Sequence, residues 1–195
     1  GLGLAEVATN TVVGKDALNA NTTGASNVAI GQDALGANTT GANNTASGYK
    51  ALYSNTSGYR NTALGNNTLE ANTTGYWSTA VGPWALNSNT SGYANTALGY
   101  SSLINTTTGY QNTASGNQAL RSNTTGVENT ATGSYALYSN TTGAENTAIG
   151  HRSLHLSTTA SHNTACGINA MYYNTTGAYN VAIGKNALHT NTTGG

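Results

Sequence analysis

Residues of the types that bind zinc lie close together near the C-terminal end of the chain. They are His151, His155, His162 and Cys166. Imidazole and thiolate are preferred zinc ligands, but a structural site needs four of them at one point in space. Whether these four side chains meet depends on the elements that carry them.

Carboxylates recur in pairs that are 17 residues apart. Asp16 and Asp33 form one pair, and Glu128 and Glu145 form the other. Two carboxyl groups about 5 Å apart are the arrangement of a retaining glycosidase. No base or orienting group accompanies either pair in the sequence, so we predict no catalytic residue and no enzymatic activity.

Tyrosine recurs at the same spacing, at Tyr59, Tyr76, Tyr93 and Tyr110. Trp77 and Trp84 lie nearby in the sequence. Aromatic rings at a regular interval could form a platform for sugar rings or for a partner fibre. They could equally stabilise an exposed β-surface without any ligand. These six residues are the predicted surface-recognition residues.

The spacing of 17 residues is the period of nearly the whole chain. Eleven units follow the pattern N-T-T-G-x-x-N-T-A-x-G-x-x-A-L-x-x, and they start at residues 4, 21, 38, 55, 72, 89, 106, 123, 140, 157 and 174, with a partial unit from 191. We number the positions of the unit as columns, so that Asn21 is in column 1. A fixed period indicates a solenoid, and we predict one repeat domain over residues 1–195.

Two columns of glycine divide each unit. Column 4 is broken at Val7 and Ala160, whereas column 11 is glycine throughout. Glycine at these points predicts positive φ or a tight bend, and the short segments between, rich in Thr, Val and Ile, predict strands. The predicted fold is all-β: a parallel β-solenoid, or β-roll, of about eleven coils and roughly 53 Å in length. The predicted structural turn residues are Gly31, Gly48, Gly65, Gly82, Gly99, Gly116, Gly133, Gly150, Gly167 and Gly184.

Three columns supply the predicted core. Column 15 is leucine in every unit but one, column 9 is almost always alanine, and column 7 is almost always asparagine. Stacked asparagine side chains can form amide ladders along such a column. Representative core residues are Leu35, Leu52, Leu86, Leu120, Ala46, Ala97, Asn44 and Asn95.

The strand Asn27-Val28-Ala29-Ile30 shows how the two faces of the sheet differ. Asn27 and Ala29 share one face, and Val28 and Ile30 share the other. The sequence leaves open which face lines the interior, and we favour Asn and Ala. Charged residues after Glu6 occur only in columns 6, 12, 13 and 16, and we expect these columns and the tyrosine-rich column 5 to face solvent. A charge-free outward face predicts lateral association of rods.

The repeat also separates the candidate zinc ligands. His151, His155, His162 and Cys166 fall in four different columns, and His155 and His189 share a column but lie two coils apart, about 10 Å. We therefore predict neither a metal site nor a cofactor. The Asn-Thr-Thr sequons at Asn21, Asn38 and elsewhere match N-glycosylation acceptors, but they are part of the repeat itself, which favours a structural role.

Composition narrows the classes of partner. Only 6% of residues are charged and the formal net charge is zero, so we predict no binding to nucleic acid. No stretch approaches the ~20 apolar residues of a membrane span. The single cysteine excludes an internal disulfide framework. Because the chain begins without methionine or a signal peptide, we expect a processed product or an excerpt.

Asn27-Val28-Ala29-Ile30-Gly31 and Asn180-Val181-Ala182-Ile183-Gly184 resemble the N-S-V-A-I-G core of head repeats in trimeric autotransporter adhesins. The complete 17-residue pattern also resembles repeat regions of bacterial and phage tail-fibre-like proteins. The adhesin repeat is a few residues shorter. The resemblance implies a left-handed roll, assembly as a trimer, and attachment to cells, matrix or glycans outside the cell or on a virion tail fibre.

The sequence therefore predicts an extracellular structural and adhesive fibre or head module that self-associates into a trimer or an end-to-end filament. An alternative is a carbohydrate-binding tail-fibre segment. Another is an ice-binding solenoid, because threonine rows run through columns 2 and 3, as at Thr22 and Thr23. A polysaccharide-processing solenoid would need long loops to build a cleft, and no unit carries even one inserted residue.

Overall fold

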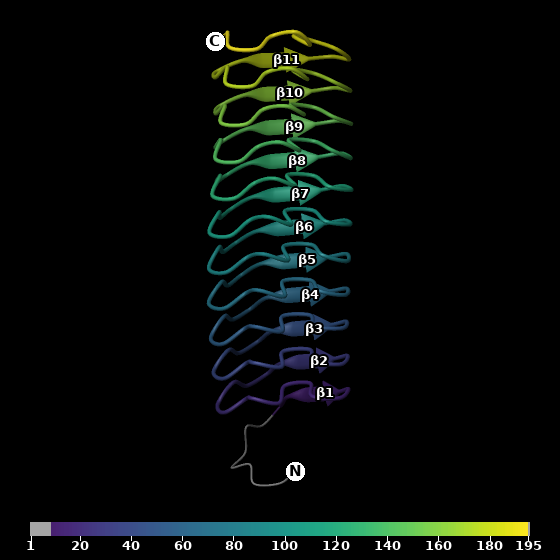
Figure 1. The fold of residues 1–195 in the computed structure, drawn as a ribbon, viewed down its shortest axis with the longest axis vertical. Helices are drawn as coiled ribbons and strands as arrows, with labels where there is room; N and C mark the ends of the chain where they lie inside the picture. Colours follow the sequence, from purple (N-terminus) through teal and green to yellow (C-terminus); the bar gives the residue numbers. More distant parts are fainter. Residues whose placement is uncertain (1–8, 195) are drawn as a thin grey trace.

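Eleven short strands lie one above another in chain order along one side of a rod (Figure 1). The computed structural model describes residues 9–194. Residues 4–8 of the first unit, with Glu6 and Val7, lie outside this range. The strands are β1 (Thr11–Val13), β2 (Val28–Ile30), β3 (Thr45–Ser47), β4 (Thr62–Leu64), β5 (Thr79–Val81), β6 (Thr96–Leu98), β7 (Thr113–Ser115), β8 (Thr130–Thr132), β9 (Thr147–Ile149), β10 (Thr164–Cys166) and β11 (Val181–Ile183).

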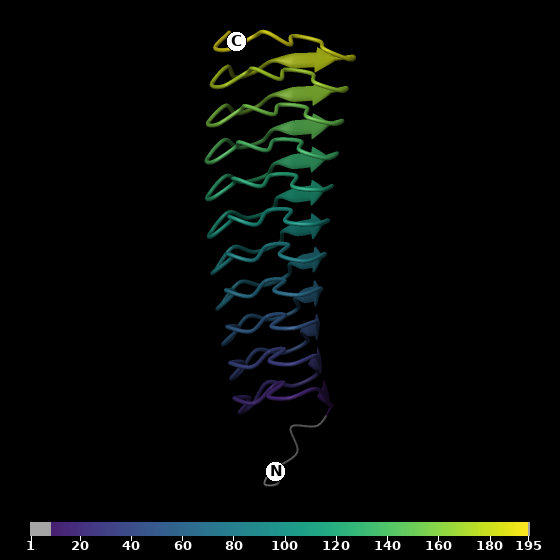
Figure 2. The same cartoon turned by 45° about the vertical axis from the view of Figure 1, so that its right-hand side comes forward.

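All eleven strands belong to one parallel sheet, in which each strand pairs only with its neighbours in the chain. The register is one repeat, so that Ala46 of β3 lies beside Ala63 of β4. The predicted all-β parallel solenoid with a 17-residue coil is confirmed. The direction of the strands turns gradually from β1 to β11 (Figure 2). Within the described range, no helix is long and apolar enough to cross a membrane.

The interior of each coil is narrow and is filled by small and branched side chains. Ala29 is fully buried whereas Ile30 is 40% exposed, so the alanine face of the strand lines the interior, as favoured from the sequence. Since alternate residues of a strand point to opposite faces, columns 8 and 10 must point outward. The fully buried residues include Leu35, Leu52, Leu86, Leu120, Ala46, Ala97, Asn44 and Asn95.

Each coil turns through three left-handed residues that are not glycine. In the coil that starts at Asn38 these are Asn43, Lys50 and Leu52, with φ of 59°, 53° and 52°. A left-handed backbone costs a residue with a side chain roughly 1–2 kcal/mol. The leucine of column 15 is fully buried in most coils, so burial of its side chain offsets that cost.

The two glycine columns are needed for different reasons. Gly99 of column 11 has φ of 130°, the positive φ expected from the sequence. Gly92 of column 4 does not adopt such a φ. A methyl group there would collide with the carbonyl oxygen of Gly109 and with Oδ1 of Asn89. Column 4 is therefore glycine because neighbouring coils approach closely.

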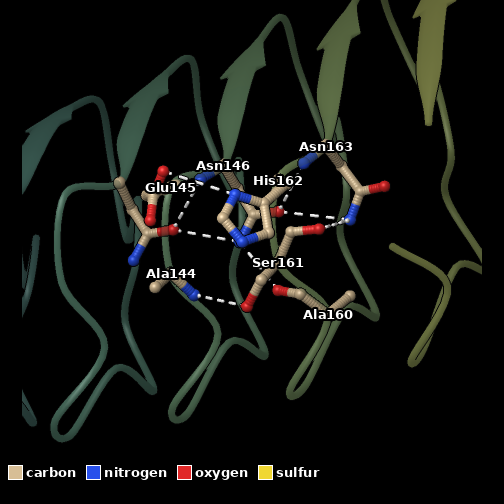
Figure 3. Close-up of polar contacts among 8 residues, drawn as sticks. Ala144, Glu145, Asn146, Ala160, Ser161, His162 and Asn163 are labelled. Atoms are coloured by element: carbon tan, nitrogen blue, oxygen red, sulfur yellow. Dashed lines mark hydrogen bonds and ion pairs between the residues drawn. The ribbon is translucent and has the colours of Figure 1, made fainter. Parts of the chain in front are cut away.

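Two ladders of asparagine side chains join the coils. In column 7, the backbone N–H of Asn163 donates to Oδ1 of Asn146 at 3.1 Å, and Nδ2 of Asn146 donates to the carbonyl of Ala160 at 2.8 Å (Figure 3). In column 1, Nδ2 of Asn55 donates to Oδ1 of Asn38 at 2.7 Å. Buried amides cost free energy unless they are bonded, and these ladders satisfy almost all of them.

The ladder of column 1 is interrupted at two points. Thr106 and Ser157 replace asparagine there. Among the described residues, the buried atoms without a hydrogen-bond partner are Oδ1 of Asn89, Oδ1 of Asn140 and Oγ of Ser157. Each of the two orphaned amide oxygens belongs to the asparagine directly before an interruption, where the next donor is missing.

Candidate recognition surfaces

Tyr59, Tyr76, Tyr93 and Tyr110 form one continuous stack. The successive ring centroids are 5.0, 5.0 and 4.8 Å apart, and the ring planes differ by 5° at most. One residue per coil in column 5 places the rings at the coil spacing. Desolvation within the stack, together with the neighbouring phenols of Tyr110 and Tyr76, raises the pKa of Tyr93.

This stacking limits what the tyrosines can bind. The faces of the Tyr76 and Tyr93 rings are covered by their neighbours in the stack. A sugar packs against the face of an aromatic ring, and here only ring edges and hydroxyl groups are left to point outward. Within the stack, only the outer faces of Tyr59 and Tyr110 are not covered by another tyrosine.

Trp77 lies crosswise to this stack and offers the missing ring surface. Its indole is inclined by 79° to the Tyr76 ring at a centroid distance of 5.1 Å. Because both faces of Tyr76 are covered, this contact must use the edge of the tyrosine. The Trp77 side chain is 52% exposed, so much of the indole is open to a ligand.

Trp84 repeats this arrangement in column 13. It is 41% exposed and inclined by 79° to Tyr100, at 5.6 Å. Trp77 precedes β5 and Trp84 follows it, so the two indoles flank one strand along the chain. The predicted recognition residues thus form two groups. Trp77 and the four stacked tyrosines lie in columns 5 and 6, before the strand of each coil, and Trp84 lies in column 13, after the strand.

A second aromatic stack occupies column 16 and was not predicted. It consists of Tyr138, His155, Tyr172 and His189, with centroids 5.1, 5.0 and 5.5 Å apart. The signal in the sequence is a run of four planar side chains in one column. Tyrosine and histidine alternate there, so neither residue type forms a run of its own in that column.

The candidate chemical residues are distributed over the rod rather than gathered. Within residues 9–194, no three His, Cys, Asp or Glu side chains come together as a metal site would require. Glu145 lies 3.3 Å from Nδ1 of His162 in the next coil (Figure 3). Asp16 lies 3.9 Å from the ammonium group of Lys15. One member of each predicted carboxylate pair, Asp16 and Glu145, is thus paired with a basic group and not with the other carboxylate.

The threonine hydroxyls of column 2 are bonded within the rod. Oγ1 of Thr39 donates to the carbonyl of Thr56 at 2.9 Å, and the same bond recurs from Thr22 to Thr192. These hydroxyls hold neighbouring coils together. Their protons are therefore used within the rod, whereas the hydroxyl oxygens can still accept hydrogen bonds.

The sequons of column 1 are similarly part of the structure. Asn38 and Asn55 are fully buried, and the amide nitrogen of each donates two hydrogen bonds. A glycan on such a nitrogen would have to lie inside the rod.

The outward face of the sheet is the largest uniform surface of the rod. Column 8 is threonine or valine in every strand, and column 10 is Ser, Thr or Cys in four strands and aliphatic in the other seven, among them Ile30, Leu64, Val81, Leu98 and Ile149. These five side chains are 36–43% exposed. No charged side chain occurs in either column from β1 to β11. Cys166, a free cysteine, lies in the same column and is partly exposed.

In comparisons with protein-family models, curated proteins and solved structures, nothing matches this chain.

Proposed function

We propose that this chain is a structural and adhesive module of an extracellular fibre. Its rods associate along the outward face of the sheet, and the aromatic residues on either side of that face serve for attachment. The observation that carries the proposal is the charge-free outward face of threonine and mostly aliphatic side chains, which runs along the sheet from β1 to β11. Exposed aliphatic side chains that recur along one face without a charge mark an interaction site.

The occupant that fits this face best is a second copy of the chain. The face spans eleven strands, or about 50 Å at the usual strand spacing. A partner must match that length and repeat its contacts at the same interval, and another rod of this sequence does both. Columns 8 and 10 alone present only about 500 Å², below the roughly 800 Å² per partner of a standard interface. Flanking columns must therefore also be contacted, as in a bundle of three rods.

Self-association is tested by placing charges on the face. In Val81→Lys/Leu98→Lys, two neighbouring strands each carry a lysine that association would bury without a partner. Sedimentation velocity on the whole chain should show oligomers for the natural sequence and monomers for this variant. The matched control is Thr74→Lys/Ser91→Lys, which adds the same two charges to the same two coils at exposed positions outside the sheet.

Cys166 gives an independent readout without mutation. Because it lies in the outward column of β10, its thiol should react more slowly with a maleimide as the protein concentration rises and the face becomes covered. A chain that sediments as a monomer at millimolar concentration, with a thiol reactivity independent of concentration, would overturn the proposal.

A further inference from the structure

Along one edge of the C-terminal half of the rod, the side chains that are basic or acidic are all basic. Columns 12, 13 and 16 hold no Asp or Glu between residues 121 and 189. The acidic residues of these coils, Glu128 and Glu145, are in column 6, which precedes the strand of each coil, whereas columns 12, 13 and 16 follow it. We call this surface the basic edge, and its members are Arg121, His151, Arg152, His155, Lys185 and His189.

The side chains of the basic edge are held in place by aromatic rings. The guanidinium of Arg121 lies 5.6 Å from the centre of the Tyr138 ring, and Nη1 donates to the tyrosine hydroxyl at 3.3 Å. The guanidinium of Arg152 lies 5.8 Å from the centre of the Tyr135 ring. A guanidinium held over an aromatic ring can still donate hydrogen bonds from N–H groups at its outer rim to another partner.

The arginines have no acidic partner among the described residues. The ion pairs there involve Lys15, Lys50 and His162. Arg121 and Arg152 are therefore oriented by rings but not neutralised by a carboxylate. A surface of this kind pays little entropy to bind an anion, because the side chains are ordered before the ligand arrives.

Ring surface suited to an uncharged part of the ligand lies beside His189 of the basic edge. Tyr173 is 45% exposed and is inclined by 68° to Tyr172 and by 86° to His189, the upper part of the second stack. The rings of that stack cover one another, so Tyr173 presents a face where they present edges. This is the relation that Trp77 has to the first stack.

We propose that the basic edge binds an acidic polysaccharide that lies along the rod. The proposal deepens the adhesive function proposed above and rests on it. A linear ligand is indicated because Arg121, Arg152 and Lys185 are spread over four coil steps, about 19 Å. A polysaccharide offers carboxylates to the arginines and the apolar faces of its sugar rings to Tyr173.

The density of charge argues against nucleic acid as the occupant. Duplex DNA carries one negative charge per about 1.7 Å of its axis. Three permanent cations over about 19 Å cannot neutralise such a chain. A polyuronate with one carboxylate on each sugar or on every second sugar is a closer match.

His155 makes this surface dependent on pH. Burial, and also the nearby charges of Arg152 and His151, lower the pKa of His155, although a hydrogen bond between its Nδ1 and the carbonyl of Tyr135 acts in the opposite direction. Tyr138 and Tyr172 cover its two faces and carry no charge when protonated. His155 therefore adds no charge to the three permanent cations of the basic edge at neutral pH, and adds one on sufficient acidification.

The experiment measures binding of the whole chain to immobilised alginate, with dextran as the uncharged control polymer. We expect binding to alginate alone, tighter at pH 5.5 than at pH 7.5. Arg121→Gln and Arg152→Gln should each weaken it by about threefold, as for a solvent-exposed ion pair. Arg60→Gln removes the same charge from column 6 and should have no effect.

Tyr173→Ala separates recognition of sugar from attraction of charge, because it should weaken binding without altering the charge. A single-stranded oligonucleotide or an anionic vesicle that competes as well as free alginate would overturn the proposal, as would equal losses in Arg60→Gln and Arg152→Gln. Sedimentation keeps the two proposals apart. Val81→Lys/Leu98→Lys should still bind alginate, whereas Arg152→Gln should associate normally.

Discussion

Ala160 occupies space that Ser157 leaves free. In the preceding coil, a methyl group at Gly143 would collide with the carbonyl oxygen of Ala160 in the next coil and with Oδ1 of Asn140, three residues earlier. Ser157 has no amide at that place, and the side chain of Ala160 is accommodated and buried. The two departures from the repeat thus compensate each other, and this compensation explains why they occur in the same coil.

Restoring both residues should stabilise the rod. In Ser157→Asn/Ala160→Gly, the new amide nitrogen can donate to the orphaned Oδ1 of Asn140, and the unpartnered hydroxyl is removed. A buried polar atom without a partner costs roughly 1–3 kcal/mol. We expect the free energy of unfolding in urea to rise by about 1–2 kcal/mol.

The single variants provide the control. Ser157→Asn alone should be destabilising, because the amide meets the methyl group of Ala160, and Ala160→Gly alone should gain nothing. The coupling energy of the double-mutant cycle should exceed about 1 kcal/mol. Additive effects would contradict the compensation.

Ser78→Asn should also stabilise the rod, by repairing the ladder of column 7. Ser78 is buried, and its Oγ accepts from the backbone N–H of Asn95 at 3.3 Å, a longer bond than in most coils. An asparagine there would shorten this bond and donate to the carbonyl of Gly92. We expect a gain of about 1 kcal/mol in urea denaturation. Ser78→Ala, which removes the acceptor, should lose stability by a similar amount.

Gln118→Gly should stabilise the chain although it removes a side chain. Gln118 has φ of 54°, in the left-handed region. Glycine adopts this backbone without the steric cost, roughly 1–2 kcal/mol, that other residues meet. Its greater freedom in the unfolded chain offsets part of this, so we expect a gain of about 0.5 kcal/mol in thermal or urea unfolding. Asn117→Gly, one residue earlier and outside the left-handed region, should instead destabilise.

Acidification should destabilise the rod through His155. Its pKa in the folded state lies below the ordinary value of 6.5, so the unfolded chain takes up the proton first as the pH falls. The stabilising contribution is present above pH 6.5 and is lost as the pH falls through the lower, folded-state pKa. The midpoint of urea unfolding should therefore decrease between pH 7.5 and pH 5.

His155→Tyr identifies the residue responsible. A tyrosine can continue the stack between Tyr138 and Tyr172 without titrating in this range. The decrease in midpoint on acidification should be smaller in this variant than in the natural chain. An equal decrease in the natural chain and in His155→Tyr would show that His155 is not the source.

The periodic part of the molecule was predictable from the sequence because each column reports the same environment many times. Eleven leucines or methionines in column 15 indicate burial more firmly than any single leucine could. The same repetition predicted the coil length and the parallel sheet, but it left open which face of the strand lines the interior. Repetition averages out the local ambiguity that limits predictions from a single segment.

The backbone of Leu52 shows where such inference ends. Leucine rarely adopts positive φ, and the residue types of column 15 do not predict the left-handed turn. The direction of aromatic rings is another limit. Tyr76 and Trp77 are adjacent in the sequence and equally aromatic, but stacking closes the faces of the first and leaves the second open. Only the relative orientation of rings in three dimensions distinguishes them.

The interruptions at Thr106 and Ser157 also have a mechanical meaning. They divide the amide ladder of column 1 into three lengths, within which every coil is bonded to the next through asparagine. A fibre that anchors a cell or a particle is loaded along its axis. Under such tension, neighbouring coils should separate first at these two interruptions. The rod would then lengthen in separate segments before the remaining coils come apart.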